Sequence, residues 1–283
     1  MRSRSAMEQV LDGKLGRLRA LISGYGSLIV AFSGGVDSTL LLKVAHDTLG
    51  EKAAAVTARL KSFPEREYEA AKSIARNIGA RHITVDSECL GIEGFRMNLP
   101  DRCYFCKKEI FGKLMEIARA EGIRFVADGD SCDDLKDYRP GSKAAAELGV
   151  VSPLREACLS KEDIRALSKE LGLSTWDKPP FACLASRFPC GTEITEEALD
   201  TVNRAEQVLL DLGFRQVRVR HYGTMARIEV GADEVERFFG RGMKDGIVRA
   251  LKELGYRHVC LDLEGYRTGS MNETLGLRDE KNR

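Results

Sequence analysis

Several features are scarce or missing in this chain of 283 residues, and each absence removes a class of protein. No apolar run is long enough to cross a bilayer, and residues 1–9 form a polar stretch with no apolar signal core. We therefore expect a cytoplasmic protein with no membrane contact. The net charge is only +1, which gives no general attraction to nucleic acid, so we expect no nucleic-acid partner.

Signatures of metal sites and of simple repeats are also scarce. The four histidines are scattered, and the C-x-x-C at Cys103 and Cys106 has no second copy, so a closed zinc site would need distant partners. There is no internal repeat and no low-complexity tract. In a reducing cytoplasm the eight cysteines would stay as thiols, which makes them candidate nucleophiles or metal ligands rather than disulfides.

What is present is an alternation of strand and helix patterns in the first half of the chain. Helical spacing of apolar residues predicts helices at 7–23, 40–45, 64–78 and 103–120. Short apolar runs between them predict strands at 28–32, 52–57, 81–85 and 123–127. This order predicts an α/β fold with a doubly wound, mostly parallel sheet, and a ligand at the carboxyl ends of its strands.

The second half is predicted to contain more helices, a hairpin and a domain boundary. Shorter elements are expected as a helix at 143–148, a strand at 150–154 and a helix at 160–171 that opens with a capping box. A proline-rich stretch follows, and we divide the chain into residues 1–190 and 191–283. The smaller α+β domain is predicted to have helices at 195–212, 233–239 and 243–254 and strands at 214–220, 225–230 and 258–263. The polar end from Thr268 is expected to fray.

One short loop joins the first predicted strand to the next helix. It consists of Ser33, Gly34, Gly35, Val36, Asp37 and Ser38. Two glycines permit a tight turn with inward N–H groups, and the helix start adds unpaired N–H groups and a positive dipole end. The pattern is neither a Walker loop nor a dinucleotide-binding loop. It resembles the S-G-G-x-D-S loop of enzymes that adenylate a substrate with ATP and release pyrophosphate.

Residues at the ends of two other strands extend this predicted nucleotide site. Thr57 ends the second strand and is predicted to line the adenine pocket. Asp128 and Gly129 begin an acidic loop after the fourth strand, which suits Mg²⁺ beside a pyrophosphate because magnesium prefers carboxylate and phosphate oxygens. Asp37 is another candidate ligand for Mg²⁺, although it could simply cap its helix. A solvated acidic turn is the alternative interpretation of residues 128–134.

Cysteines are the candidate reactive groups once a substrate has been activated. Cys183 and Cys190 lie on the proline-rich stretch near Arg187, and a nearby cation stabilises a thiolate. Cys103 and Cys106 open a helix whose dipole lowers thiol pKa values. That pair is compatible with a zinc half-site, a redox pair, an iron–sulfur half-site or plain packing.

A pair of arginines is the candidate site for a phosphorylated substrate. Arg218 and Arg220 share one face of a predicted strand, where two guanidinium groups can bind a phosphate bidentately. The alternative is a solvated strand face whose charge is balanced by Glu206 and Glu229.

Four segments together resemble the ATP-dependent sulfur transferases of the LarE family, which have the PP-loop, HUP-like fold. They are residues 33–38, 102–108, 128–134 and 182–189. The resemblance spans residues from about 10 to about 265 and implies a role in making the nickel-pincer nucleotide of lactate racemase. It implies that ATP and Mg²⁺ adenylate a carboxylate of a pyridinium-dicarboxylate mononucleotide, which Cys183 then attacks, expelling AMP. Cleavage of the cysteine Cβ–S bond would leave a thiocarboxylate on the product and dehydroalanine on the protein.

The same resemblance implies further assignments and leaves the sulfur source open. Some members of the family are thought to carry a [4Fe–4S] cluster on three cysteines, for which the candidates are Cys183, Cys190, Cys103 and Cys106. Arg187 is assigned to the nucleotide, and the substrate phosphate is assigned to Glu206, Arg218 and Arg220. A homo-oligomer is expected, together with other cofactor-biosynthesis proteins as partners.

Other classes of protein share parts of this pattern. A tRNA-thiolating enzyme would have the same loop and a C-x-x-C, but near-zero net charge and no evident RNA-binding domain argue against it. An ammonia-dependent amidating synthetase would need no special cysteine. A nucleotide-binding protein without activity would release no pyrophosphate.

Overall fold

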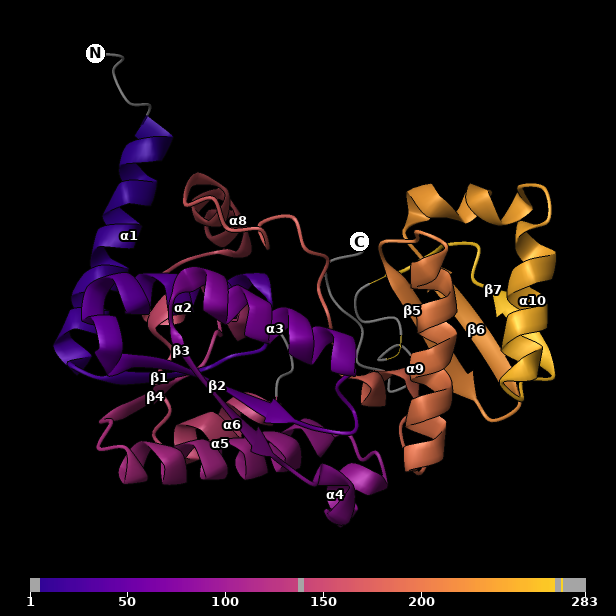
Figure 1. Cartoon of the computed structure of the whole chain (residues 1–283), viewed down its shortest axis with the longest axis horizontal. Coiled ribbons are helices and arrows are strands. Elements are labelled where there is room, and N and C mark those ends of the chain that lie inside the picture. Colours follow the sequence, from indigo (N-terminus) through magenta and orange to yellow (C-terminus); the bar gives the residue numbers. More distant parts are fainter. Residues whose placement is uncertain (1–5, 137–139, 268–270, 272–283) are drawn as a thin grey trace. The chain divides into compact units, whose positions relative to one another are not determined.

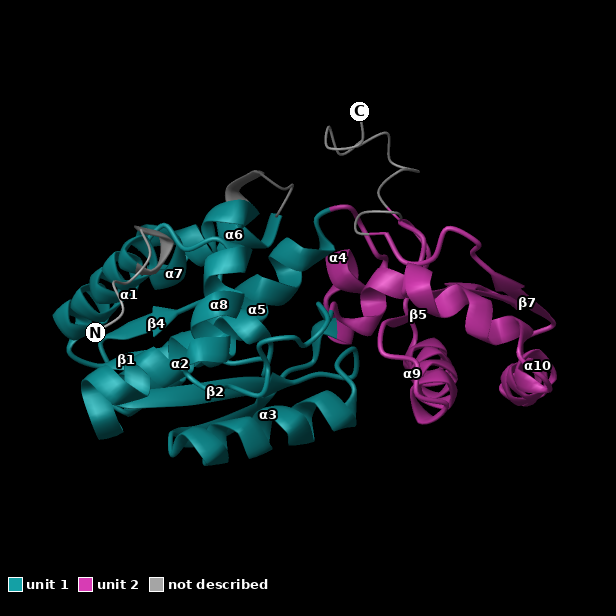
Figure 2. Cartoon of the chain, turned by 90° about the horizontal axis from the view of Figure 1, so that it is seen from above, with its two compact units in different colours: residues 1–89, 101–181 teal, residues 90–100, 182–283 magenta. Residues whose placement is uncertain are grey.

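The computed structural model describes residues 6–136, 140–267 and Met271. Its contacts divide the chain into two compact units, coloured separately in Figure 2. Unit 1 comprises Met1–Cys89 and Asp101–Phe181, and unit 2 comprises Leu90–Pro100 and Ala182–Arg283. We call Leu90–Pro100 the insert. The boundary predicted after residue 190 differs from this division, in which the segment around Cys183 belongs to unit 2.

Unit 1 is built on a sheet of four parallel strands (Figure 1). Their order is β3-β2-β1-β4, with bounds Arg81–Asp86, Ala53–Arg59, Leu28–Ala31 and Phe125–Ala127. The chain leaves β1 towards β2 and β3 on one side and later returns to β4 on the other. The carboxyl ends of β1 and β4 therefore flank the point where the winding direction reverses, which is the usual ligand position in such sheets.

Helices cover both faces of this sheet, which confirms the doubly wound α/β prediction. In Figure 1, α2 and α3 lie on one side of the strands, and α5 and α6 lie on the other. Side chains alternate along β1. Leu28 and Val30 belong to the hydrophobic cluster that includes α2 and α3, and Ile29 belongs to the cluster that includes α5 and α6. The helices of unit 1 are α1 Ala6–Tyr25, α2 Val36–Leu49, α3 Glu65–Ile78, α5 Arg102–Ala120, α6 Pro140–Glu147, α7 Pro153–Glu156 and α8 Lys161–Glu170. No helix in the described part of the chain has the length and apolar character needed to span a membrane.

Local signals account for some of these boundaries and fail at others. The capping box at Ser160 and Asp163 is present at the start of α8, as predicted. The predicted strand at 150–154 is wrong: Val151 makes a single parallel bridge to Ala127, and Pro153 begins α7. Proline has no N–H to donate to a strand ladder and suits the first turn of a helix.

Unit 2 contains a three-stranded mixed sheet and two longer helices. β5 Val217–Tyr222 and β6 Met225–Val230 form the predicted antiparallel hairpin, and β7 His258–Leu261 adds in parallel to β6. The helices are α4 Glu93–Arg96 in the insert, α9 Glu196–Asp211 and α10 Met243–Glu253. The helix expected at 233–239 is a 3₁₀ helix, η5, over Ala232–Phe239. Thr268, from which fraying was expected, lies outside the described residues.

Candidate active site

The loop of residues 33–38 leaves the carboxyl end of β1 and turns directly into α2. Gly34 has a φ of +68°, and a Cβ placed on it would lie 2.9 Å from Ala71 Cα of α3. Gly35 is the extended N-cap residue, and its N–H donates to Ser33 Oγ at 3.3 Å. The Ser33 and Ser38 hydroxyls are 3.2 Å apart. The turn thus gathers two hydroxyls and the amino end of α2 at one position, as an anion site requires.

Gly34→Ala is expected to be more damaging than Gly149→Ala, although both glycines have a φ near +70°. The left-handed conformation costs either alanine about 1–2 kcal/mol. Gly149 has open space around it, whereas at Gly34 the clash with the α3 backbone adds about 1–3 kcal/mol. Urea denaturation of the two variants measures the difference. Equal losses would show that Gly34 is needed only for its backbone conformation.

The loop after β4 packs against the loop after β1. A Cβ on Gly129 would lie 3.3 Å from Ser38 N and 3.4 Å from Asp37 Cβ, so glycine permits this close approach. The preceding Asp128 is 4% exposed, and its Oδ1 accepts from Asp130 N. Its Oδ2 is buried and has no hydrogen bond of normal geometry from a described residue. Burial, followed by the Asp130 carboxylate, raises the pKa of Asp128, while the nearby Ser152 hydroxyl partly opposes this.

Asp128→Asn is expected to gain stability over the wild type as pH rises. The pKa of Asp128 is higher in the folded state than in the unfolded state, so folding favours the protonated carboxyl. The stabilisation that results is fully present below the unfolded-state pKa of about 3.9 and is lost as pH rises through the folded-state pKa. The asparagine variant stays neutral and avoids that loss. Urea unfolding at about pH 4 and about pH 8 tests this, with the exposed Asp200→Asn as control. A stability difference that is the same at both pH values would contradict the burial argument.

Three lysines that the sequence did not assign to the nucleotide loop converge on this end of unit 1. Lys161 Nζ lies 2.6 Å from Asp37 Oδ2 and 3.2 Å from Asp134 Oδ2. Lys178 Nζ donates to Gly34 O at 3.2 Å, and Lys107 Nζ lies 3.5 Å from Asp130 Oδ1. Each lysine is distant in sequence from its partner, so only the fold reveals the contact. Together they place three ammonium groups around the loops where a polyphosphate is expected to lie.

Thr57 lies at the carboxyl end of β2, as predicted, but its side chain is already engaged. Its Oγ1 donates to Phe32 O at 2.7 Å and lies 2.8 Å from His82 Nε2. Burial lowers the pKa of His82, which favours the neutral ring beside this hydroxyl. The Thr57 hydroxyl therefore links β2 to β3 and to Phe32, the residue that follows β1, and its place in an adenine pocket stays a prediction.

Cys183 lies in unit 2, immediately before the short helix η4 (Leu184–Arg187), and is partly exposed. Arg187 Nη1 donates to Ala182 O at 2.7 Å and to Cys183 O at 3.2 Å. Ser186 Oγ also donates to Cys183 O, at 2.9 Å. These bonds hold the carbonyl groups of Ala182 and Cys183, while Cys183 as a residue remains partly exposed.

Arg187, expected from the sequence at the nucleotide, is 0% exposed and is engaged within unit 2, so the nucleotide contact stays a prediction. Its Nε and Nη2 bind the two oxygens of Glu206 at 2.7 and 3.1 Å. Glu206, expected at the substrate phosphate, is the buried counter-ion of Arg187 and also accepts from Val219 N. In this structure both residues position the Cys183 segment on α9 and β5.

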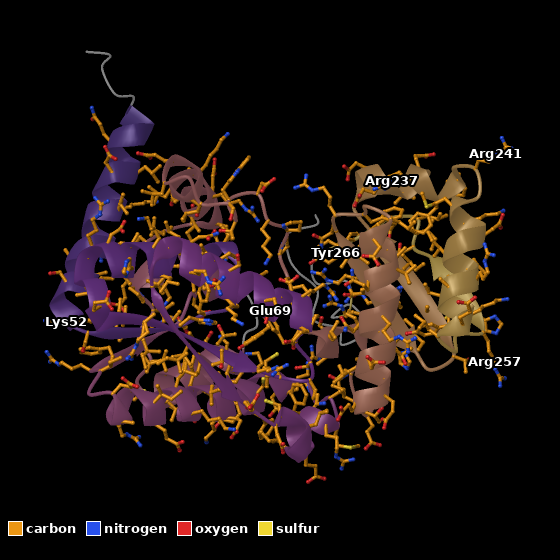
Figure 3. The ribbon with its side chains drawn as sticks, in the orientation of Figure 1. Lys52, Glu69, Arg237, Arg241, Arg257 and Tyr266 are labelled. Carbon is orange, nitrogen blue, oxygen red and sulfur yellow. The ribbon has the colours of Figure 1, made fainter. Side chains whose placement is uncertain are left out.

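Arg218 and Arg220 share one face of β5, as predicted, but that face is buried, and each is 5% exposed. Arg220 makes a bidentate pair with Glu229, at 2.9 and 2.6 Å, and also donates to Ser186 O. Arg218 lies over the ring of Tyr266, labelled in Figure 3, with 4.9 Å between the guanidinium carbon and the ring centre. Burial, followed by repulsion from Arg187, lowers the pKa of Arg218 to about 10.

The candidate cluster cysteines divide between the two units. Cys103 and Cys106 are in unit 1, and Cys183 and Cys190 are in unit 2. Over the described residues, no group of three or more His, Cys, Asp or Glu side chains is arranged to hold a metal ion. The iron–sulfur cluster on these cysteines therefore stays a prediction.

Comparison with known proteins identifies the family. Residues 27–96 match the family model described as "Queuosine biosynthesis protein QueC". The pyridinium-3,5-bisthiocarboxylic acid mononucleotide synthase of Lactiplantibacillus plantarum is 41% identical over 94% of this chain and 96% of its own length. The chain belongs to the LarE family of ATP-dependent sulfur transferases. An uncharacterised Synechocystis protein, slr1717, is 44% identical over 94% of the chain and 99% of its own length.

Membership of the LarE family confirms the resemblance drawn from the four sequence segments. It also confirms that the chain is an enzyme of the ATP-using PP-loop class. The relationship extends to an uncharacterised protein of Methanocaldococcus jannaschii, 31% identical over 85% of this chain and 91% of its own length. The matches with all three proteins cover most of both units, so unit 2 is part of the LarE family architecture.

Proposed function

We propose that this LarE-family enzyme adenylates a carboxylate of a pyridinium-dicarboxylate mononucleotide and replaces it with a thiocarboxylate. The related L. plantarum synthase carries this product in its name. The observation that carries the proposal is the Cys183 segment, where a buried arginine binds two backbone carbonyls and Cys183 itself is partly exposed. A binding protein or an amidating synthetase would not need that thiol.

Unit 1 supplies the ATP chemistry in this proposal. The amino end of α2 and the hydroxyls of Ser33 and Ser38 receive the pyrophosphate that leaves when the substrate carboxylate attacks the α-phosphorus. Lys161 and Lys178 neutralise the charge that builds on the leaving pyrophosphate, since both already lie at this loop. The products of this step are an acyl adenylate and pyrophosphate.

Mg²⁺ fits the acidic side of the same site. The buried Oδ2 of Asp128 is an acceptor that needs a partner, and magnesium commonly uses one or two carboxylates together with phosphate oxygens. Asp37 would have to exchange its contact with Lys161 for the ion. When bound, Mg²⁺ would neutralise the phosphates. Asp128 is therefore the first residue to substitute in a test of magnesium dependence.

Unit 2 supplies the substrate site and the nucleophile. Arg218 and Arg220 would bind the substrate phosphate, because two guanidinium groups on one face of β5 can donate to several phosphate oxygens. The Cys183 thiolate attacks the acyl adenylate carbonyl carbon, a thioester forms, and AMP leaves with the bonding electron pair. Removal of the Cα proton of Cys183 then expels the thiocarboxylate and leaves a Cα–Cβ double bond on the protein.

The experiment is anaerobic incubation of the enzyme with ATP, Mg²⁺ and the dicarboxylate mononucleotide. We expect pyrophosphate, AMP and a thiocarboxylate product, with a loss of about 34 Da, one H₂S, at Cys183. Repeated turnover without this mass change, together with iron in the protein, would replace the sacrificial cysteine with a cluster-bound sulfide. The proposal would be overturned if the mononucleotide caused no release of pyrophosphate. It would also be overturned if tRNA or ammonia stimulated this release in place of the mononucleotide.

We further propose that the enzyme acts in the cytoplasm as a homo-oligomer. Its substrate and product are intermediates, so other proteins of the same cofactor pathway are the expected partners. Sedimentation of the purified chain tests the oligomeric state.

A further inference from the structure

Two thiols that the proposed function does not use lie together at the base of the insert. Cys89 is the last residue of unit 1 before the insert, and Cys106 lies near the start of α5, after the chain returns to unit 1. Their Sγ atoms are 3.4 Å apart. Cys89 is buried, whereas Cys106 is partly exposed, so a small reagent can reach one thiol of the pair.

The far end of the insert is bonded to the segment that follows Cys183. Asn98 Nδ2 donates to Phe188 O at 3.1 Å and to Pro189 O at 2.7 Å. Gly191 N donates to Asn98 O at 3.0 Å. Asn98 has a φ of 51°, a left-handed conformation that asparagine tolerates and that directs both its backbone and side chain to this segment. The insert is thus hydrogen-bonded to residues 188–191 of unit 2, which follow Cys183 in the chain.

We propose that Cys89 and Cys106 are a reversible dithiol–disulfide site that is oxidised by a peroxide. The Cys106 thiolate attacks one peroxide oxygen, and the O–O bond breaks to give a sulfenic acid and, after protonation, water. The Cys89 sulfur then displaces the sulfenic oxygen as a second water, and an S–S bond forms. In total, two thiols and one hydrogen peroxide give one disulfide and two waters, and a small dithiol reverses the reaction by exchange.

The bond would close residues 89–106 into a covalent loop with the insert as its tip. Closing a loop of this length removes many conformations of the detached insert, so local opening becomes rarer. Oxidation would therefore make the hydrogen bonds between the insert and residues 188–191 open less often, without adding any contact to the thiol of Cys183. The site needs neither ATP nor the mononucleotide, so its test is independent of the proposed function.

Peptide mapping tests the link directly. The full-length protein is reduced, freed of reductant, treated with hydrogen peroxide, blocked with an alkylating reagent and digested with trypsin. We expect peptide 82–96 joined to peptide 103–107, and its loss after reduction with dithiothreitol. Cys103→Ser is the matched control on the same helix and should keep the link, whereas Cys106→Ser and Cys89→Ser should abolish it. A bond confined to Cys103 and Cys106, or complete alkylation of Cys89 and Cys106, would overturn the proposal.

Hydrogen exchange tests the consequence for the insert. On oxidation, the amides of residues 94–99 and 188–194 should exchange at least about tenfold more slowly in the wild type and in Cys103→Ser. Cys106→Ser should show no such change under the same treatment. Unchanged exchange in a wild-type sample that carries the disulfide would show that the disulfide does not stabilise the contact between the insert and residues 188–191.

Discussion

Cys183→Ser should lower thiocarboxylate formation by at least about 10³-fold, because a serine hydroxyl is a far weaker nucleophile and carries no sulfur to transfer. Substrate-dependent release of pyrophosphate should continue, since the loop that receives it lies in unit 1 and does not involve this residue. Mass spectrometry of the nucleotide product, alongside a pyrophosphate assay, measures the two outcomes separately.

Cys190→Ser and Cys260→Ser are the controls for this prediction. Cys190 lies on the same segment as Cys183, and Cys260 is an exposed cysteine on β7. If Cys183 is the sacrificed sulfur, both control variants should keep single-turnover activity. Loss of activity in Cys190→Ser as well would favour a cluster held partly by Cys190. Unchanged sulfur transfer in Cys183→Ser would contradict any essential role for this thiol.

Arg187→Ala is expected to destabilise unit 2 by about 3–5 kcal/mol, because it leaves the buried Glu206 carboxylate without its partner. The variant also removes the donors that hold Ala182 O and Cys183 O. Urea denaturation followed by circular dichroism measures the loss, and hydrogen exchange at α9 and β5 shows where it occurs.

Arg204→Ala is the matched control on α9. Arg204 pairs with Asp200 at 3.7 Å on the helix surface, where both side chains are about 60% exposed, so its loss should cost at most about 1 kcal/mol. Arg187→Lys should lie between the two, because lysine keeps the charge but cannot bind Glu206 bidentately. Equal effects of Arg187→Ala and Arg204→Ala would show that the buried pair contributes no more than a surface pair.

Local signals in the sequence predicted the layers of unit 1 well. Short apolar runs, glycine at helix ends and the Ser160 capping box depend on neighbouring residues, so a single segment is enough to recognise them. The same logic placed Arg218 and Arg220 on one face of β5, because side chains alternate along any strand.

Burial and distant partners could not be predicted in this way. In the sequence, the positive charge of Arg187 near a cysteine favours the prediction of a ligand contact. Only the fold shows that Arg187 is paired with Glu206 of α9. Lys161 contacts Asp37 although more than a hundred residues separate them in the sequence, and no local pattern in either segment predicts this contact. The face of β5 with the two arginines was expected to be accessible, but Tyr266 from the end of the chain covers part of it.

The discontinuity of unit 2 has a consequence for how the protein is synthesised. The insert leaves the ribosome long before residues 182–283, yet Arg96 O accepts from Ile194 N and Asn98 holds Phe188 O. Unit 2 is divided between the insert and the segment from Ala182, so it cannot complete its fold before that later segment has emerged. A fragment beginning at Ala182 would lack these bonds, and the Cys183 segment can reach its final contacts only after all of unit 1, which ends at Phe181, has been synthesised.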